Sequence, residues 1–333
     1  MEYNIVDYKV NKPISKQIIH SICDQIDNGL LKIGDSIPSV NQLVSMYGIS
    51  RGTVFTAYNA LKSSGVIKSI PGKGYFVSSI KTNASHNIFL LFTTFSSYKE
   101  VLYNSFINHL NGKCNVDIYF HHYNIKIFEQ LIKTSINQYN TFVVMPMVHK
   151  RIPEILSILN AKSVYLLDLG FNEYGNRFAG VYQNFEDDIY LILKSKLHLI
   201  SKYRRLFLVN HEDFRSREIL TGFNRFAKES PIETKVVTIE QFSDIRLHDA
   251  FITVEDTDLV SIINATKQKK WKIGKDIGIL SYNETALKSI ISEGISTIST
   301  DFNLMGKQIA ELILNREQKI IENQFIMIDR KSF

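Results

Sequence analysis

The sequence has little cysteine: its 333 residues include only two, Cys23 and Cys114. These lie far apart in hydrophobic runs, so they offer neither a disulfide framework nor the spacing of a metal site, and a reducing compartment fits. No apolar run reaches the roughly 18 residues of a membrane span. The N-terminus also lacks the charged-then-apolar order of a signal peptide. We therefore expect a cytoplasmic protein with no membrane partner.

A strong excess of one charge is also missing. The 39 lysines and arginines are offset by 33 acidic residues, which leaves a formal net charge of +6. This balance leans towards a polyanionic partner but does not by itself indicate nucleic acid. Hydrophobic residues make up 44% of the chain, which is enough to form a hydrophobic core. The length of the chain fits two domains better than a single small domain.

Catalytic motifs are absent from the sequence as well. An enzyme would need a nucleophile with its base, a metal cluster or a phosphate loop, and none of these patterns occurs. No lysine stands in a convincing context for pyridoxal phosphate. We therefore expect a protein that is not an enzyme and that carries no cofactor and no metal.

The pattern of the chain divides it into two regions. Residues 1 to about 80 read as three helices and a pair of short strands, and they end in the polar stretch SSIKTNASH, which is typical of a linker. From residue 86 on, apolar runs alternate with helix-period segments, and the alternation resumes after Gly180. This rhythm is typical of parallel sheets covered by helices and suggests two similar lobes.

The first helix of the N-terminal region is a scaffold. Ile14, Ile18, Ile22 and Ile26 recur every four residues and form one apolar stripe, which Gly29 closes.

Two short capped helices follow and predict a helix-turn-helix. Ser39 can cap a helix that ends at Gly48, and Ser50 can cap a second helix that ends at Gly65. In this motif the N-terminal residues of the second helix meet base edges. The expected DNA contacts in these helices are Ser39, Ser50, Arg51, Gly52, Thr53 and Thr56, whereas Val54, Tyr58 and Leu61 face inward. The guanidinium of Arg51 could grip a guanine edge or clamp a phosphate.

The segment VIKSIPGKGYFVSS predicts a hairpin with Pro71, Gly72, Lys73 and Gly74 at its tip. Lys73 is the only charge at this tip, so the hairpin could touch the minor groove or the backbone of DNA. The alternative is that a Gly-Lys-Gly turn is merely a turn. We include Gly72, Lys73 and Gly74 among the expected DNA contacts.

Residues 13–78 resemble the DNA-binding domain of the GntR family. The landmarks stand in the family's order: Gly34-Asp35, Ile37-Pro38-Ser39, Leu43, Ser50-Arg51, Thr53-Val54, Ala57, Leu61, Gly65 and the GKGYFV wing. The resemblance implies a winged helix-turn-helix at residues 1–78, joined by a linker at 79–85 to the rest of the chain. The family usually carries basic residues shortly after the Pro-Ser pair and just after Thr-Val; here those places hold Val40 or Asn41, and Phe55.

Polar and aromatic residues follow the predicted strands of the α/β region. In open α/β sheets, ligands sit beyond the carboxyl ends of the strands. Carboxylates and amides beside aromatic rings are what a sugar site needs, although a carboxylate there could instead only cap the next helix. The residues at these strand ends are Thr93, Thr94, Phe95, Ser96, Tyr98, Asp168, Phe171, Glu255, Asp256 and Asn283.

The C-terminal third resembles the sugar-binding domain of the lac repressor family, which has the fold of type I periplasmic binding proteins. DAFITVEDTDLVSII, KIGKDIGILSYNET, GISTISTDFNLMGKQIAELIL and DRKSF carry the resemblance, which continues weakly upstream. It implies a cleft-facing Asp256, Asn283 in place of an acid, and Phe302 close to the ligand. Ile219 replaces an arginine that often holds ligand, and Arg215 or Arg217 could reach the cleft instead.

The implied architecture is a two-lobed α/β domain with parallel sheets at residues 86–333. Lobe 1 covers about 86–181 and 297–320, and lobe 2 covers about 182–296 and 321–333.

A chain that joins a GntR-type DNA-binding domain to a lac-repressor-like effector-binding domain resembles the arabinose-repressor subgroup. The resemblance implies a homodimer on a double-stranded DNA operator, most commonly a repressor of a carbohydrate-utilisation operon, with an effector bound between the lobes. A neutral monosaccharide fits the mixture of acids, amides and aromatics, and a sugar phosphate could bind through Arg215, Arg217 or Lys288. The alternative is an α/β domain that only dimerises or binds a non-sugar ligand.

Overall fold

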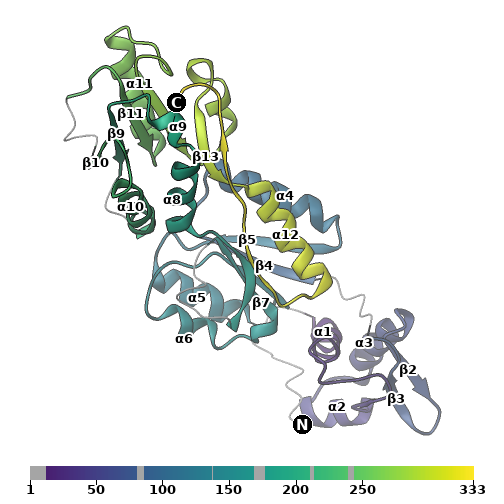
Figure 1. Cartoon of the computed structure of the whole chain (residues 1–333). Helices are drawn as coiled ribbons and strands as arrows, with labels where there is room; N and C mark the ends of the chain where they lie inside the picture. The colour runs from purple at the N-terminus through teal and green to yellow at the C-terminus, as the bar shows by residue number, and fades with distance from the viewer. Residues whose placement is uncertain (1–12, 81–85, 137, 169–176, 211–213, 239–243) are drawn as a thin grey trace. The chain divides into compact units, whose positions relative to one another are not determined.

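The computed structural model describes residues 13–80, 86–136, 138–168, 177–210, 214–238 and 244–333. These residues form an N-terminal domain of helices with a small sheet, followed by a larger α/β region with two six-stranded sheets (Figure 1).

The N-terminal domain is a helix-turn-helix with a β wing, as predicted. Its antiparallel sheet has the strand order β1-β3-β2, and the hairpin between β2 and β3 forms the wing. Strand β1 is an addition to the predicted elements, because two residues are too few to give a sequence pattern. The elements are α1 (Ile14–Asp27), β1 (Ser36–Ile37), α2 (Val40–Tyr47), α3 (Arg51–Ser63), β2 (Ile67–Ile70) and β3 (Gly74–Val77).

Serine caps fix the residues at which α2 and α3 begin. The Ser39 hydroxyl accepts from the Gln42 backbone N–H at 3.2 Å, and the Gln42 side chain accepts from the Ser39 backbone N–H at 2.7 Å, which is a capping box. The Ser50 hydroxyl accepts from the Thr53 backbone N–H at 3.1 Å. Gly48 ends α2 with a φ of 62°, a left-handed conformation that a residue without Cβ adopts at little cost.

A single hydrophobic core holds the helices of this domain together. Ile18 of α1 packs with Val54 and Leu61 of α3 in that core, and all three are almost fully buried. Tyr58 is also buried, and its hydroxyl donates to the carbonyl of Pro38, which ties α3 to the segment before α2. The predicted inward face of α3 is confirmed, so its other face is free to meet a partner.

The first sheet of the α/β region has the strand order β14-β8-β7-β6-β4-β5. Strand β4 pairs in parallel with both β5 and β6, and β14 pairs in parallel with β8. Strands β6 and β7 are buried along their whole length, as parallel strands beneath helices are. The elements are β4 (His86–Phe92), α4 (Ser97–Leu110), β5 (Cys114–Phe120), α5 (Ile125–Ser135), β6 (Thr141–Val144), α6 (Ile152–Leu156), η1 (Ala161–Ser163), β7 (Val164–Asp168), β8 (Ala179–Tyr182) and β14 (Ile320–Glu322).

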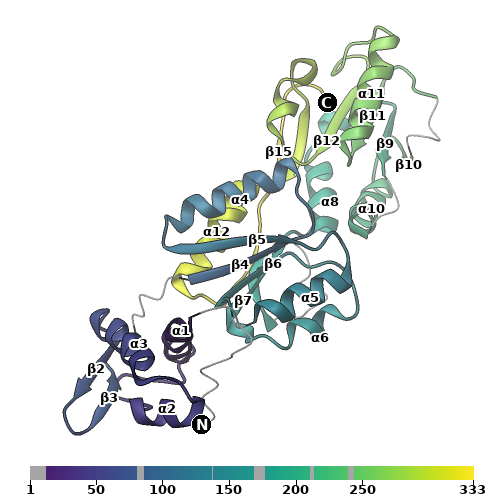
Figure 2. The same cartoon turned by 180° about the vertical axis from the view of Figure 1, so that it is seen from behind.

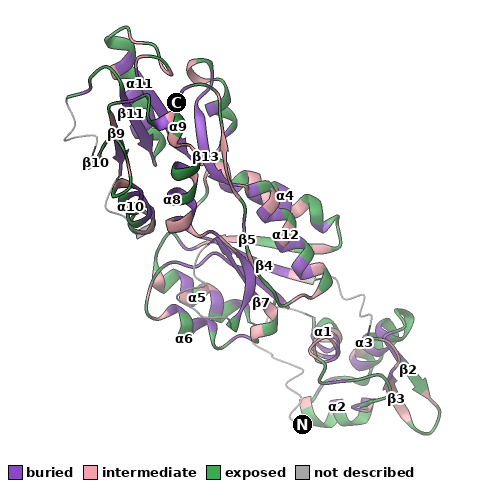
Figure 3. Cartoon of the chain, viewed as in Figure 1, coloured by how far each residue is buried: buried purple, intermediate pink, exposed green. Residues whose placement is uncertain are grey.

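The second sheet has the strand order β10-β9-β11-β12-β13-β15. Its strands are parallel except for β15, which runs antiparallel to β13 and departs from the all-parallel expectation. Strands β11 and β13 are buried throughout (Figure 3). The elements are α8 (Phe185–Ser195), α9 (Leu197–Ile200), β9 (Arg205–Val209), α10 (Phe214–Ala227), β10 (Glu233–Val237), β11 (Asp249–Thr253), α11 (Asp256–Gln268), β12 (Gly278–Tyr282), η4 (Ala286–Ser289), η5 (Ile291–Glu293), β13 (Ser296–Thr300) and β15 (Phe325–Ile328). Helix α12 (Phe302–Asn315) follows β13 and packs on α4 beside the first sheet.

The segments that connect the two sheets are tied together by one asparagine. The Asn323 backbone N–H donates to the Tyr182 carbonyl at 2.8 Å. Its side-chain amide donates to the Thr300 hydroxyl at 2.6 Å and to the Asp301 carbonyl at 2.9 Å.

Strand pairing moves the predicted lobe boundaries by a few residues. β13 belongs to the second sheet because it pairs with β12, and β14 belongs to the first because it pairs with β8. The chain therefore changes sheets after β13 and after β14, and not at the expected positions near 296 and 320.

Glycines let pairs of helices approach closely. A Cβ at Gly222 of α10 would lie 2.2 Å from the carbonyl oxygen of Glu186 in α8. A Cβ at Gly306 of α12 would lie 2.6 Å from the carbonyl oxygen of Leu102 in α4. Figures 1 and 2 both show α10 beside α8 and α12 beside α4. These positions therefore require glycine for the observed packing.

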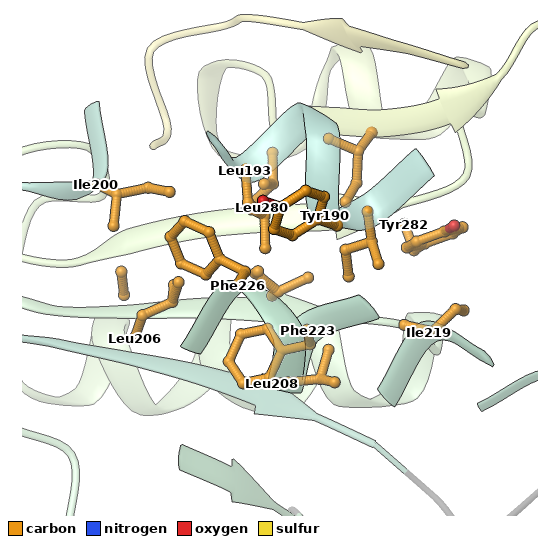
Figure 4. Packing of buried hydrophobic residues seen from close by; sticks show 14 of the residues in the cluster. Tyr190, Leu193, Ile200, Leu206, Leu208, Ile219, Phe223, Phe226, Leu280 and Tyr282 are labelled. Carbon is orange, nitrogen blue, oxygen red and sulfur yellow. The ribbon is translucent and has the colours of Figure 1, made fainter. Parts of the chain in front are cut away.

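Aromatic and aliphatic residues fill the space between α8, α10 and the second sheet. Phe223 and Phe226 of α10 pack with Leu193 of α8 and with Leu206 and Leu208 of β9 (Figure 4). All of them are nearly fully buried.

Candidate DNA-binding surface and effector site

The N-terminal end of α3 presents a positively charged, exposed surface. Arg51, Gly52 and Thr56 are exposed, as a DNA-reading position requires. The Arg51 guanidinium donates to the Asn41 side-chain oxygen at 2.8 Å, which links the first residue of α3 to α2. Helix α3 contains Arg51 and Lys62 and no acidic residue. Its field therefore favours a polyanion.

The other predicted contacts in these helices are engaged in capping. The hydroxyl of Ser39 and that of Ser50 each accept a backbone N–H of the helix that follows. Thr53 is half-buried, and its hydroxyl lies 2.9 Å from that of Ser50. Ser39, Ser50 and Thr53 thus shape the start of each helix. Arg51 and Thr56 are exposed, and the Thr56 hydroxyl donates to the Gly52 carbonyl at 2.9 Å.

The wing carries its charge at the tip. Gly72 and Gly74 have φ values of 72° and 106°, which favour glycine, and the backbone N–H of Lys73 donates to the Ile70 carbonyl at 3.0 Å. Lys73 is exposed, so its ammonium can meet a phosphate or a groove edge.

Two aromatic residues predicted for the effector site lie together. The rings of Tyr98 and Phe302 stack with centroids 4.9 Å apart, where α4 and α12 begin. Phe95 is 54% exposed, whereas Thr94 is half-buried after β4. Phe302 is buried, whereas Tyr98 is half-buried.

Asp256 is paired within the protein. Its carboxylate lies 2.8 Å from the ammonium of Lys288, which is buried and which also donates to the carbonyls of Tyr282 at 2.8 Å and Asn283 at 2.9 Å. Three partners therefore occupy the three hydrogens of this ammonium. These contacts hold η4 against the end of β12, and the binding of a phosphorylated sugar by Lys288 stays a prediction.

Asp168 is held by a residue that the sequence analysis did not select. It ends β7 with a φ of 74° and is almost fully buried. Its carboxylate accepts from the Gln183 side-chain amide, and its carbonyl accepts from the Gln183 backbone N–H at 3.1 Å.

The remaining residues predicted for the effector site differ in their exposure to solvent and in their hydrogen bonds. Asn283 has a φ of 64° and is half-buried, and its backbone N–H donates to the Ile298 carbonyl at 2.8 Å. Glu255 precedes α11 and is exposed without capping it through its side chain, and Arg217 of α10 is also exposed. Phe171 and the side chain of Arg215 lie outside the described residues.

Several buried polar groups at the connections between the sheets were missed from the sequence. Gln183, Asp188, Tyr282 and Asn323 are between 2% and 9% exposed. Each has one side-chain oxygen without a hydrogen-bond partner among the described residues. Gln183 follows β8, Asp188 lies in the first turn of α8, Tyr282 ends β12 and Asn323 follows β14. The order of these segments in the chain does not show that they are connected in the fold, so the sequence contains no signal for the group.

The electrostatics of these groups are unusual. Burial raises the pKa of the Asp188 carboxyl to about 7, and the negative charge of Glu322 adds to the rise. Burial also raises the pKa of the Tyr282 hydroxyl well above its ordinary value, and the charges of Asp188, Asp168 and Glu218 act in the same direction.

Within the described residues, no group of three or more histidine, cysteine, aspartate or glutamate side chains could hold a metal ion. None of the described helices is long and apolar enough to cross a membrane.

The two domains match two known families. Residues 14–77 match the family of bacterial regulatory proteins named gntR, and residues 198–332 match the periplasmic binding protein-like domain. The fold and the resemblances predicted for both parts are thereby confirmed.

The N-terminal match extends to a named relative. The mannosyl-D-glycerate transport/metabolism system repressor MngR of Escherichia coli is 37% identical over 81 residues, which cover 24% of this chain and 33% of that protein. The chain thus matches about a third of the length of this relative.

The α/β region has the fold of solved regulators. A LacI family transcriptional regulator from Silicibacter pomeroyi superimposes with a TM-score of 0.62 at 15% identity, covering 74% of this chain and 98% of that chain. The trehalose repressor from Escherichia coli gives a TM-score of 0.62 at 12% identity, covering 74% of this chain and 100% of that chain.

Proposed function

We propose that the protein is a transcription repressor of a carbohydrate-utilisation operon. The proposal is supported by the two matched domains, a GntR-type helix-turn-helix domain and a periplasmic-binding-protein-like domain. The observation that carries the proposal is the exposed start of α3, where Arg51 is oriented by Asn41. An oriented guanidinium at the first turn of a recognition helix is suited to reading a guanine edge or fixing the register on a phosphate.

The proposed active form is a cytoplasmic homodimer on double-stranded DNA. Two copies of α3 would meet two operator half-sites about one helical turn apart, and two wings would add backbone contacts through Lys73. The MngR relative is a repressor by name, which supports the proposal that this protein represses transcription and does not activate it.

The α/β region is the proposed effector domain. The stacked Tyr98 and Phe302 rings would cover the apolar face of a sugar, and Asp168 and Asn283 would take its hydroxyl groups. The buried oxygens without partners near Gln183 favour a sensing domain over one that only dimerises, because unsatisfied buried acceptors are costly without a ligand.

Selection from a randomised DNA library tests the DNA-reading role. The full-length protein is expected to enrich a two-fold symmetric duplex, whereas Arg51→Ala is expected to bind that duplex about tenfold more weakly or worse. Lys62→Ala is the matched control, because it removes the same charge from the far end of α3 and should cost much less. The proposal fails if no sequence is enriched, or if both variants bind equally well.

A further inference from the structure

Gln183, Asp188, Tyr282 and Asn323 form what we call the acceptor cluster, and its members come from four separate segments. Gln183 follows β8, Asp188 lies in α8, Tyr282 ends β12 and Asn323 follows β14. Hydrogen bonds and charges connect these segments. The Asn323 backbone N–H donates to the carbonyl of the residue before Gln183, and the Gln183 side-chain amide donates to Asp168. The charges of Asp168 and Asp188 act on Tyr282.

The unsatisfied atoms of the cluster are oxygens that can accept hydrogen bonds. They are Oε1 of Gln183, Oδ2 of Asp188, the hydroxyl of Tyr282 and Oδ1 of Asn323. The amide orientations are fixed, because the Gln183 nitrogen donates to a carboxylate and the Asn323 nitrogen donates to Thr300 and to a carbonyl. The Tyr282 hydroxyl can also donate, but the amide oxygens of Gln183 and Asn323 and the ionised carboxylate of Asp188 can only accept. A ligand that satisfies these three oxygens must therefore supply hydrogen-bond donors.

The Tyr282 hydroxyl is one of the buried oxygens of the cluster. Figure 4 shows the Tyr282 ring at the edge of the hydrophobic cluster, with its hydroxyl turned away from Phe223 and Phe226. The side chain is 2% exposed and its oxygen has no partner among the described residues.

The charge around the cluster is negative. Asp168, Asp188 and Glu218 all act on Tyr282. Glu322 acts on Asp188, and Asp187 does so to a smaller extent. Among the described residues, no basic side chain contributes to either of these effects. The ammonium of Lys288 is held by Asp256 and by two carbonyls, so it does not compensate the carboxylates.

We propose that the acceptor cluster binds a protonated amino group of the effector, so that the effector is an amine-bearing sugar or a closely related molecule. This inference rests on the proposed function, because it specifies the ligand of the same regulatory domain. An ammonium supplies three donors and one positive charge, which match unpaired acceptors among carboxylates. An anionic sugar would meet repulsion there, and a neutral hydroxyl would leave the Asp188 charge without a counter-ion.

Calorimetric titration of the full-length protein near pH 7.5 tests the inference. The probes are D-glucosamine, D-galactosamine and D-mannosamine, each compared with its neutral hexose and with D-glucuronate. At least one amino sugar is expected to bind about tenfold or more tightly than its neutral counterpart. Asp188→Asn is expected to weaken that binding about tenfold, since it keeps the size of the side chain and removes its charge.

Asp187→Asn is the matched control. Asp187 is the neighbouring acid on α8, and its charge makes the smallest contribution to the raised pKa of Asp188. Its carboxylate pairs with Arg225 at 2.6 Å, so its loss should change amino-sugar affinity less than about twofold. Equal or tighter binding of a neutral hexose or of glucuronate overturns the inference. Unchanged affinity in Asp188→Asn, or no binding of any amino sugar, overturns it as well. Each of these results leaves DNA selection intact, whereas failure of the proposed function abolishes that selection.

Discussion

At the scale of single residues, the contact between Arg51 and Asn41 is the feature that most directly shapes the DNA-reading surface. Asn41→Ala removes the oxygen that accepts from the guanidinium at 2.8 Å but leaves the charge in place. We expect this variant to bind the selected duplex roughly threefold to tenfold more weakly, less than the loss in Arg51→Ala.

A double-mutant cycle decides whether Asn41 acts through Arg51. Fluorescence anisotropy titrations of both single variants and of the double variant give the coupling energy. If Asn41 positions Arg51, the double variant binds no more weakly than Arg51→Ala. Fully additive losses would mean that Asn41 contacts DNA by itself.

Asp188 predicts a pH dependence of stability. Its pKa in the folded protein is raised to about 7, so the folded state holds this proton more tightly than the unfolded chain does. Stability is therefore lost as pH rises from the ordinary carboxyl range through about 7. Between roughly pH 5.5 and 8.5 the loss from this group is expected to be about 2 kcal/mol.

Chemical denaturation of wild type and Asp188→Asn across that pH range checks this expectation. The variant should gain stability relative to wild type as the pH rises, because an amide has no proton to lose. A constant difference between the two proteins over the whole range would show that Asp188 has an ordinary pKa.

At the scale of elements, close helix packing makes a glycine indispensable. Gly222→Ala would place a Cβ 2.2 Å from the Glu186 carbonyl oxygen and 2.5 Å from a methyl group of Ile189. Helices α8 and α10 would have to separate, which we expect to lower the free energy of unfolding by roughly 1–3 kcal/mol or more.

The neighbouring exposed residue provides the control for this substitution. Thr221→Ala changes the same helix on its solvent side and should alter the free energy of unfolding by less than about 0.5 kcal/mol. Urea unfolding of both variants measures the difference. Equal stability of Gly222→Ala and Thr221→Ala would show that α8 and α10 are far enough apart to accommodate a Cβ at position 222.

Local signals predicted the elements of the DNA-binding domain well. The caps at Ser39 and Ser50 and the glycine turn at Gly48 depend on residues only a few positions apart, so the sequence contains the whole cause. The antiparallel course of β15 could not be predicted, because it depends on which strand of the sheet it meets.

At the scale of the whole molecule, the sequence predicted which strand ends carry polar residues but not how those residues pair. The Asp256 and Lys288 ion pair joins η4 to α11, and Asn323 joins three separate segments. Such pairs are created by the topology, so periodicity and spacing contain no trace of them. The acceptor cluster was missed for the same reason.

The central claim is that one chain couples operator binding to effector binding, and such coupling must be reciprocal. The measurement that tests it most directly is an anisotropy titration of the selected duplex, with and without a saturating amount of whichever sugar stabilises the protein. The account predicts that the dissociation constant for DNA changes by about tenfold, and that the duplex changes sugar affinity by the same factor. An unchanged DNA affinity with a bound sugar would contradict the account.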